Sequence, residues 1–330
     1  MIIKNHEPPH KLLVAESLKR RLITQHHFYG KVNEIFLMER AGFFGELKVD
    51  YPLSKLNFKH VIAHDLRLPF YQNYFQMDTL LLNPRILLIL EVKNLPGIVS
   101  FDLTANKMIR TRDGVTDYYD DPVIQVKEQA FQLSEWLETH GYSNVPIEYL
   151  VVMANQETIL DIDSSYHEHL EKVVPIYGLS QKIRSIYSSY STDFITYSNL
   201  FNLGQLMVDH HTPAKVDLMK KLGITKENLI RGAFCPKCSA VPMMWKGRRW
   251  QCWSCNHRSL TAHLPGLKDY YLLLGDQISK QEFMWFMNLK SDRTAKHLLN
   301  KENLIKNGSA RGITHELNYN LEKDFNDIIF

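Results

Sequence analysis

The sequence predicts an α/β protein with a mixed central sheet flanked by helices, followed by a small cysteine-rich module and a C-terminal helical module. Three observations support this prediction. Apolar runs of strand length alternate with helical periodicity over residues 35–195. All four cysteines fall within residues 235–255, and capped helical patterns follow them. With 330 residues, 45% of them hydrophobic, the chain is long enough for two or three domains with substantial cores.

Two helical patterns come first, at residues 11–23 and 32–49. The second contains Gly42 and Gly45. A glycine inside a helix costs about 1 kcal/mol relative to alanine, so two of them predict close packing against a neighbouring backbone. Glu46 is then expected on a helix held tightly against another element, such as the sheet.

The central feature is a pair of apolar runs, at residues 75–82 and 85–94, which flank an Asn-Pro turn signal. They predict adjacent strands of a buried hairpin. Asp78, Glu91 and Lys93 interrupt the runs. Because strand side chains alternate, Glu91 and Lys93 share a face, and the turn brings Asp78 roughly opposite Glu91. Charges buried without a partner are costly, so these three groups are expected to pair or to hold a metal.

The other elements follow in order. A helix begins at Asp121-Pro122, since aspartate is a good N-cap and proline suits the first helical position. This helix runs to about residue 139 and carries Gln125 away from its buried stripe. Its place among apolar strands predicts a mixed sheet covered by helices. Strands are predicted at residues 60–68, within 96–112, at 147–155 and at 172–176, and helices at 179–187 and through 189–232.

An ordered set of motifs resembles a known family. Gly45-Glu46, Gln76-x-Asp78, Glu91-Val92-Lys93-Asn94 and Asp121-Pro122-x-x-Gln125 are similar to the motifs of the NERD, or nuclease-related, domain. This family belongs to the PD-(D/E)XK nuclease superfamily. A lone Glu-x-Lys is a common pattern, whereas the ordered set is much more specific. The resemblance implies a restriction-endonuclease-like fold for this part of the chain.

The resemblance also implies metal-dependent hydrolysis of a phosphodiester bond. Asp78 and Glu91 are expected to hold Mg²⁺ or Mn²⁺ through their oxygens, helped by the backbone carbonyl of Val92. Such an ion supplies an activated water and stabilises the negative charge that builds on the phosphate.

Three further roles follow from the resemblance. Lys93 is expected to orient or deprotonate the attacking water and to neutralise the phosphate. Glu46 would reach a metal-bound water or a second ion, and Gln125 would bind phosphate or position Lys93. The alternative is an ion pair of Lys93 with Asp78 or Glu91 in a relative that has lost catalysis and only binds DNA.

Cys235-x-x-Cys238 and Cys252-x-x-Cys255 are separated by thirteen residues. This spacing predicts a zinc ribbon, in which each pair gives two thiolates to one tetrahedral Zn²⁺. Four thiolates leave no open position, so the zinc is expected to be structural. Redox pairs or free buried thiols are the alternatives.

Basic residues and an aromatic lie between the two cysteine pairs. They are expected to grip phosphate and to stack a base, with an ordinary solvated hairpin tip as the alternative. The residues are Lys246, Arg248, Arg249 and Trp250.

The last segment predicts two short helices, opened by a capping box at Ser279 and a cap at Ser291. They resemble a helix-turn-helix, whose second helix would enter a major groove, and Asn307-Gly308 marks a turn that would form a wing. The alternative is a small helical domain with a solvated basic face. The polar face of the second helix consists of Arg293, Lys296, His297 and Asn300.

The positive charge is concentrated in the C-terminal third. Residues 231–330 carry 15 Lys and Arg against 9 Asp and Glu, a net of +6, so the total of +3 leaves −3 for residues 1–230. This asymmetry favours a nucleic-acid partner for the C-terminal part. The sequence shows no apolar run long enough for a membrane helix and no signal peptide at its start, so we expect a cytoplasmic protein without a membrane partner.

Together, these patterns and the resemblance predict a metal-dependent, endonuclease-like protein that acts on DNA. The resemblance implies a role in DNA processing, repair or defence. RNA stays an alternative substrate, and a homodimer would suit cutting two strands. The rival hypothesis is a non-catalytic DNA-binding or regulatory protein that uses the nuclease fold as a scaffold. The expected domains are an N-terminal helical extension (1–34), a NERD domain (35–195), a helical linker (196–230), the zinc ribbon (231–263) and the helix-turn-helix-like module (264–330).

Overall fold

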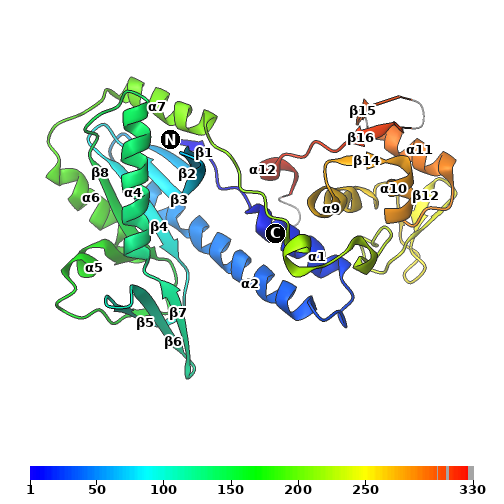
Figure 1. The fold of residues 1–330 in the computed structure, drawn as a ribbon, viewed down its shortest axis with the longest axis horizontal. Helices are drawn as coiled ribbons and strands as arrows, with labels where there is room; N and C mark the ends of the chain where they lie inside the picture. Colours follow the sequence, from blue (N-terminus) through cyan, green and yellow to red (C-terminus); the bar gives the residue numbers. More distant parts are fainter. Residues whose placement is uncertain (303, 310–311, 326–330) are drawn as a thin grey trace. The chain divides into compact units, whose positions relative to one another are not determined.

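The structure is a computed structural model that describes residues 1–302, 304–309 and 312–325 (Figure 1). The chain forms two compact units. Met1–Glu7 and Arg40–Ala214 make up the first unit, and Pro8–Glu39 and Lys215–Phe330 make up the second. Helix α2 (Tyr29–Glu46) therefore starts in the second unit and ends in the first.

The first unit is built on a six-stranded mixed sheet, as the sequence predicts. β1 pairs parallel with β2, the strands β2, β3 and β4 pair antiparallel, and β4, β8 and β10 pair parallel. The predicted hairpin is β3 and β4, in the register that pairs Thr79 with Leu90. In spatial order, the strands are β1 (Ile2–Lys4), β2 (Val61–Phe70), β3 (Asn73–Leu82), β4 (Leu87–Lys93), β8 (Ile147–Met153) and β10 (Val173–Pro175).

Helices cover both faces of this sheet, because the strands are apolar on both sides. In β4, Leu87 and Ile89 pack in one core cluster, with side chains of α4 and α7, whereas Leu88 and Leu90 pack in another, with side chains of α3 and α6. Figure 1 shows α4 running along the sheet. By alternation, Glu91 faces the same side as α4. These helices are α3 (Asp50–Ser54, preceded by the turn η1 at Leu47–Val49), α4 (Pro122–Thr139), α6 (Leu179–Ser189) and α7 (Tyr197–Asp209).

A second sheet in this unit has the strand order β7-β6-β5-β9. Strand β7, which pairs with β6, lies beyond residues 96–112, where strands were predicted. α4 begins directly after it, where Asp121 caps the helix by accepting a hydrogen bond from the amide of Val123, as predicted. The elements are β5 (Gly97–Asp102), β6 (Lys107–Arg112), β7 (Val115–Asp120), β9 (Thr158–Leu160), α5 (His167–Lys172) and the turn η2 (Ile176–Gly178).

One irregularity interrupts the central sheet where β2 and β3 meet. The ladder pairs His64 with Thr79 and Leu66 with Met77, but not the residues between them. Asp65, one of these, has a positive φ of 50°, which is uncommon outside glycine. Side chains on either side of this point, such as Ala63 and Leu66, pack in the same core cluster, so the alternation changes there. Such irregularities re-aim side chains and are over-represented beside active sites.

The second unit joins the N-terminal helix α1 (His10–Arg21) to the C-terminal part of the chain. Arg21 is fully buried and pairs with the buried carboxylate of Asp269 on helix α9, with Nε and Oδ2 2.8 Å apart. The stretch 189–232, predicted as helical, holds helix α7 in the first unit and helix α8 and the 3-10 turn η3 in the second, with segments between them that belong to no helix or strand. The elements are α8 (Leu218–Leu222), the turn η3 (Lys226–Asn228), the ribbon strands β11 (Met244–Lys246), β12 (Arg249–Gln251) and β13 (Arg258–Ser259), and α9 (Leu264–Leu274).

The C-terminal segment of this unit contains the two predicted short helices. Ser279 forms the capping box with Glu282, and Ser291 caps the second helix through the amide of Thr294. A small sheet of order β14-β16-β15 accompanies them, so the hairpin β15–β16 follows the second helix. Within the described residues, no helix is both long and apolar enough to span a membrane. The elements are β14 (Gln277–Ser279), α10 (Lys280–Phe286), α11 (Asp292–Lys301), β15 (Ile305–Asn307), β16 (Thr314–Glu316) and α12 (Leu321–Asp324).

Candidate active site

The centre of the candidate site is the end of strand β4. Glu91 is only 3% exposed, and its Oε1 accepts a hydrogen bond from Lys93 Nζ at 2.6 Å. Helix α4 contributes two amides one turn apart. Gln125 Oε1 accepts a hydrogen bond from Lys93 Nζ at 3.2 Å. Gln129 Nε2 donates a hydrogen bond to Glu91 Oε2 at 3.0 Å. Both oxygens of Glu91 are therefore held, one by an ammonium group and one by an amide.

Asp78 reaches the same place from strand β3. The backbone ladder between β3 and β4 ends at Thr79 and Leu90, so the next amides of β4 are free of β3. The amide of Val92 instead donates to Asp78 Oδ2 at 2.8 Å. This bond anchors the carboxylate beside Glu91. The carbonyl of Val92 as a metal ligand stays a prediction.

Glu46 is the last residue of α2, and the end of this helix is held against the end of β4. A Cβ atom on Gly45 would lie 2.4 Å from Asn94 Cβ, so only glycine permits this approach. Asn94 Nδ2 also donates to the carbonyl of Ala41 at 2.7 Å. At Gly42, by contrast, an added Cβ would meet no described atom within 4 Å. The prediction of close packing therefore holds at Gly45 and is wrong at Gly42.

The crowded carboxylates shift one another's ionisation. Burial raises the pKa of Glu46 well above its usual value, and the neighbouring charges of Asp78 and Asp65 raise it further. Burial and Glu91 likewise raise the pKa of Asp78, although Lys93 counteracts them. Burial by itself lowers the pKa of Lys93, but Glu91 and Asp78 outweigh it and raise that pKa above its usual value. Such shifts are typical of functional sites.

Residues 41–154 match the model of the nuclease-related domain, NERD. This part of the chain is a nuclease-related domain. The matched range contains the residues from Glu46 to Gln125 that meet at the end of β4. Comparisons with curated proteins and with solved structures gave no significant match.

The first unit also contains side chains near the site to which the sequence analysis assigned no role. Gln129 of α4 is one of them. The others form a cluster of imidazoles and carboxylates beside Glu46. A carboxylate oxygen of Asp65 lies within 4.8 Å of one of Glu46, and Asp65 Oδ2 accepts a hydrogen bond from the backbone amide of Glu7 at 2.9 Å. The His-Asp pair at 64–65, within an apolar strand, was the available signal.

Two histidines complete this cluster. His6 Nδ1 lies 3.5 Å from Asp65 Oδ2, and His6 Nε2 lies 3.3 Å from Asp50 Oδ1. Burial lowers the pKa of His6, but Asp50 and Asp65 raise it to about 9. The ring of His64 stacks on His6, with centroids 3.7 Å apart. Burial and His6 lower the pKa of His64 to about 4.

The four cysteines of the second unit cluster as the sequence predicts. The Sγ atoms of Cys235 and Cys255 are 3.6 Å apart, as are those of Cys238 and Cys252. A tetrahedral zinc with bonds of about 2.3 Å separates its sulfur ligands by roughly 3.8 Å. The cluster is therefore a plausible structural zinc site.

The residues between the cysteine pairs divide into two groups. Lys246, Arg248 and Arg249 are exposed. Trp250 is fully buried, and its Nε1 donates to His263 Nδ1 at 3.1 Å. The prediction that Trp250 stacks on a base is therefore wrong, because its ring fills the core of the ribbon.

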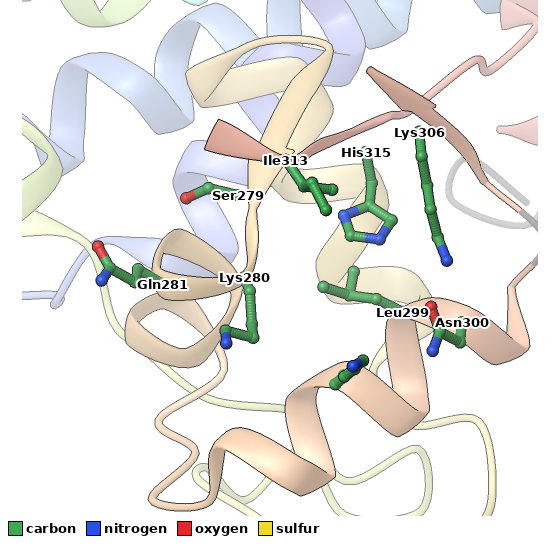
Figure 2. A pocket seen from close by; sticks show the side chains of 9 residues that line it. Ser279, Lys280, Gln281, Leu299, Asn300, Lys306, Ile313 and His315 are labelled. Carbon is green, nitrogen blue, oxygen red and sulfur yellow. The ribbon is translucent and has the colours of Figure 1, made fainter. Parts of the chain in front are cut away.

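On helix α11, the predicted polar face is exposed and the apolar face is buried. Lys296 and Asn300 of this face also line a cavity of about 500 Å³, together with Lys280, Lys306 and His315 (Figure 2). The exposed residues are Arg293, Lys296, His297 and Asn300, and the buried ones are Ala295, Leu298 and Leu299.

Proposed function

We propose that the chain is a divalent-metal-dependent nuclease that hydrolyses DNA. One observation carries the proposal: the acidic groups of Glu46, Asp78 and Glu91 come from three elements and gather around Lys93 at the end of β4. The NERD match over residues 41–154 supports it.

The donor atoms suit Mg²⁺ or Mn²⁺, which prefer carboxylate and carbonyl oxygens. The charges of Asp78 and Glu91 raise the pKa of Glu46, and that of Glu91 raises the pKa of Asp78, so a cation between these groups would relieve their repulsion. Asp78 and Glu91 would hold the cation, with the carbonyl of Val92 as a further ligand, and Glu46 would reach a water or a second ion beside it. The cation would supply an activated water and stabilise the charge that builds on the phosphate.

Lys93 is held ready to act on the water or the phosphate. Its ammonium group donates to Glu91 and to Gln125, and it carries three hydrogens, so one stays available for an oxygen of the substrate. Gln129 holds the far oxygen of Glu91 and so fixes the carboxylate to which Lys93 is anchored. Gln125 would position Lys93 or bind the phosphate.

The second unit supports DNA as the substrate. Residues 231–330 carry a net charge of +6, and the exposed face of α11 is polar and basic. A basic second helix followed by a β-hairpin suits insertion into a major groove, with phosphates held by neighbouring lysines. Zinc at the four cysteines would stabilise the ribbon beside this module. Action in processing, repair or defence, and assembly as a homodimer, extend the same proposal.

Substitution of Lys93 tests catalysis. Lys93→Met should lower the rate of metal-dependent cleavage by at least about 100-fold, because it removes the group that acts on the water. Lys127→Met is the matched control, since Lys127 lies on α4 and pairs with Glu168 at 3.0 Å, away from the site. Cleavage of duplex DNA, branched DNA and RNA would be compared in Mg²⁺ and Mn²⁺. Cleavage that survives Lys93→Met would refute the proposed role.

A non-catalytic DNA-binding protein is the second candidate. The observation that favours it is the ion pair between Lys93 and Glu91, which closes the site in the way a structural pair would. In that case the wild-type chain binds DNA, cleaves none of the three substrates in either metal, and Lys93→Met leaves its affinity for DNA unchanged. Cleavage in Mg²⁺ or Mn²⁺ separates the two candidates, because both would bind DNA through the second unit.

A further inference from the structure

A second group of ligand-type side chains lies in the first unit, apart from the groups assigned to hydrolysis. It consists of His6, which follows β1, Asp50 at the start of α3, and His64 in β2. One donor atom from each lies within 4.8 Å of the others. The proposed hydrolysis uses none of the three.

The distances in this group fit metal coordination. Asp50 Oδ1 lies 3.3 Å from His6 Nε2 and 3.4 Å from His64 Nε2. Zinc binds histidine nitrogen at about 2.0–2.1 Å and carboxylate oxygen at about 2.0–2.2 Å, which separates two ligands of a tetrahedron by roughly 3.3–3.5 Å. The carboxylate oxygen of Asp50 therefore lies as far from each imidazole nitrogen as two ligands of one zinc ion lie from each other.

The buried ring of His64 is the second, independent observation. This residue has no exposed surface, and its Nδ1 is fixed by Thr79 Oγ1 at 2.9 Å. Its Nε2 is also buried, has no hydrogen-bond partner among the described residues and lies toward Asp50. A buried polar atom without a partner is uncommon and calls for an explanation. A ligating histidine usually has its other nitrogen fixed in this manner.

We propose that His6, Asp50 and His64 bind one divalent transition-metal ion, of which Zn²⁺ is the probe. Two imidazole nitrogens with one carboxylate oxygen suit Zn²⁺ and its neighbours rather than Mg²⁺ or Ca²⁺. The side chain of Asp50 is 44% exposed, so solvent can reach the remaining coordination positions.

The ion would fix the N-terminal segment on the NERD domain. His6 faces Asp65 with its other nitrogen, and Glu7 donates its amide to the same carboxylate. A carboxylate oxygen of Asp65 lies within 4.8 Å of one of Glu46. Only the consequence for Glu46, a residue assigned to hydrolysis, rests on the proposed nuclease function. The metal site itself stands whether or not the chain cleaves DNA.

Zinc content tests the site in the untagged full-length chain. The protein would be stripped with a chelator, reloaded with Zn²⁺, dialysed and analysed by atomic emission. The wild type should bind at least two equivalents of zinc, one at this site and one at its four cysteines. Asp50→Asn and His6→Ala should each bind one equivalent less than the wild type. His60→Ala is the matched control and should lose none, because His60 Nδ1 bonds the carbonyl of Phe58 and His60 belongs to no group of metal-ligand side chains among the described residues.

Two results would overturn the proposal. One is a wild-type chain with a single zinc that Asp50→Asn retains. The other is a further zinc that persists in Asp50→Asn and His6→Ala but is lost in Glu91→Gln, which would place it at the NERD carboxylates. Asp50→Asn conserves shape at a partly exposed position, so the stripped variant should keep the far-ultraviolet circular dichroism of the wild type. The two tests are independent. If Lys93→Met cleaved DNA normally, the proposed role of Lys93 would be refuted, but the zinc content expected of each variant would stay the same.

Discussion

Removal of the buried carboxylate of Asp269 should strongly destabilise the second unit. Asp269 has no exposed surface. Its carboxylate accepts hydrogen bonds from Arg21, which is equally buried, and from Arg20, whose side chain is 28% exposed. Asp269→Asn conserves shape but leaves the guanidinium of Arg21 with an uncompensated charge. Breaking a buried pair in this way costs about 3–5 kcal/mol of unfolding free energy. For a unit of this size, that lowers the melting temperature by roughly 6–20 °C.

The assay is denaturant unfolding followed by tryptophan fluorescence. Four of the five tryptophans fall within residues 245–285, so the signal reports mainly the second unit. Glu34→Gln is the control, because the pair Lys31–Glu34 is about half exposed and is worth less than about 1 kcal/mol. If Asp269→Asn lowers the free energy of unfolding no more than Glu34→Gln does, the guanidinium of Arg21 does not depend on Asp269 for its compensating charge, and the reasoning fails.

The dependence on pH has a definite sign. Burial by itself raises the pKa of Asp269, but Arg21 and Arg20 outweigh it and hold that pKa below its usual value. A carboxyl with a lowered folded-state pKa stabilises the protein above its unfolded pKa, about 3.9, and loses this contribution as the pH falls through the folded value. The difference in stability between wild type and Asp269→Asn should therefore be full near neutral pH and shrink below about pH 4.

Gly45→Ala should destabilise the first unit by about 1–3 kcal/mol, because its Cβ would overlap Asn94, whereas Gly42→Ala in the same helix should stabilise by up to about 1 kcal/mol. Urea unfolding measures both, and equal effects would contradict the close approach. Gln129→Leu should cost about 1–3 kcal/mol and slow any cleavage, since it leaves an oxygen of the buried Glu91 without its donor. Unfolding and cleavage at wild-type levels would exclude a role for this bond.

Local patterns were enough to predict much of the fold. The hairpin β3–β4 follows from two apolar runs around a turn, and its charges stand out because apolar strands rarely carry them. The starts of α4 and α10 follow from capping chemistry within four residues. The cysteine cluster follows from spacing alone. In each case, the residues that determine the structure are close in sequence or share a fixed period.

The features that sequence analysis missed depend on contacts between distant segments. Arg21 and Asp269 are 248 positions apart, so nothing local shows that α1 packs with the C-terminal part of the chain. The ring of Trp250 looked available to a base, but a three-residue strand is too short for its pattern to show which face is buried. Gln129 reaches the site as well as Gln125, because α4 packs on the face of the sheet to which Glu91 belongs.

The sequence by itself determined that acidic groups and a lysine would meet at one end of a buried hairpin, and the NERD match agrees with that part of the chain. Only the tertiary structure decided what surrounds them. His6 reaches Asp65 across 59 positions, because β1 joins the edge of the sheet beside β2. Strand alternation and helix periodicity act over a few residues, whereas such neighbours are selected by the packing of the whole unit.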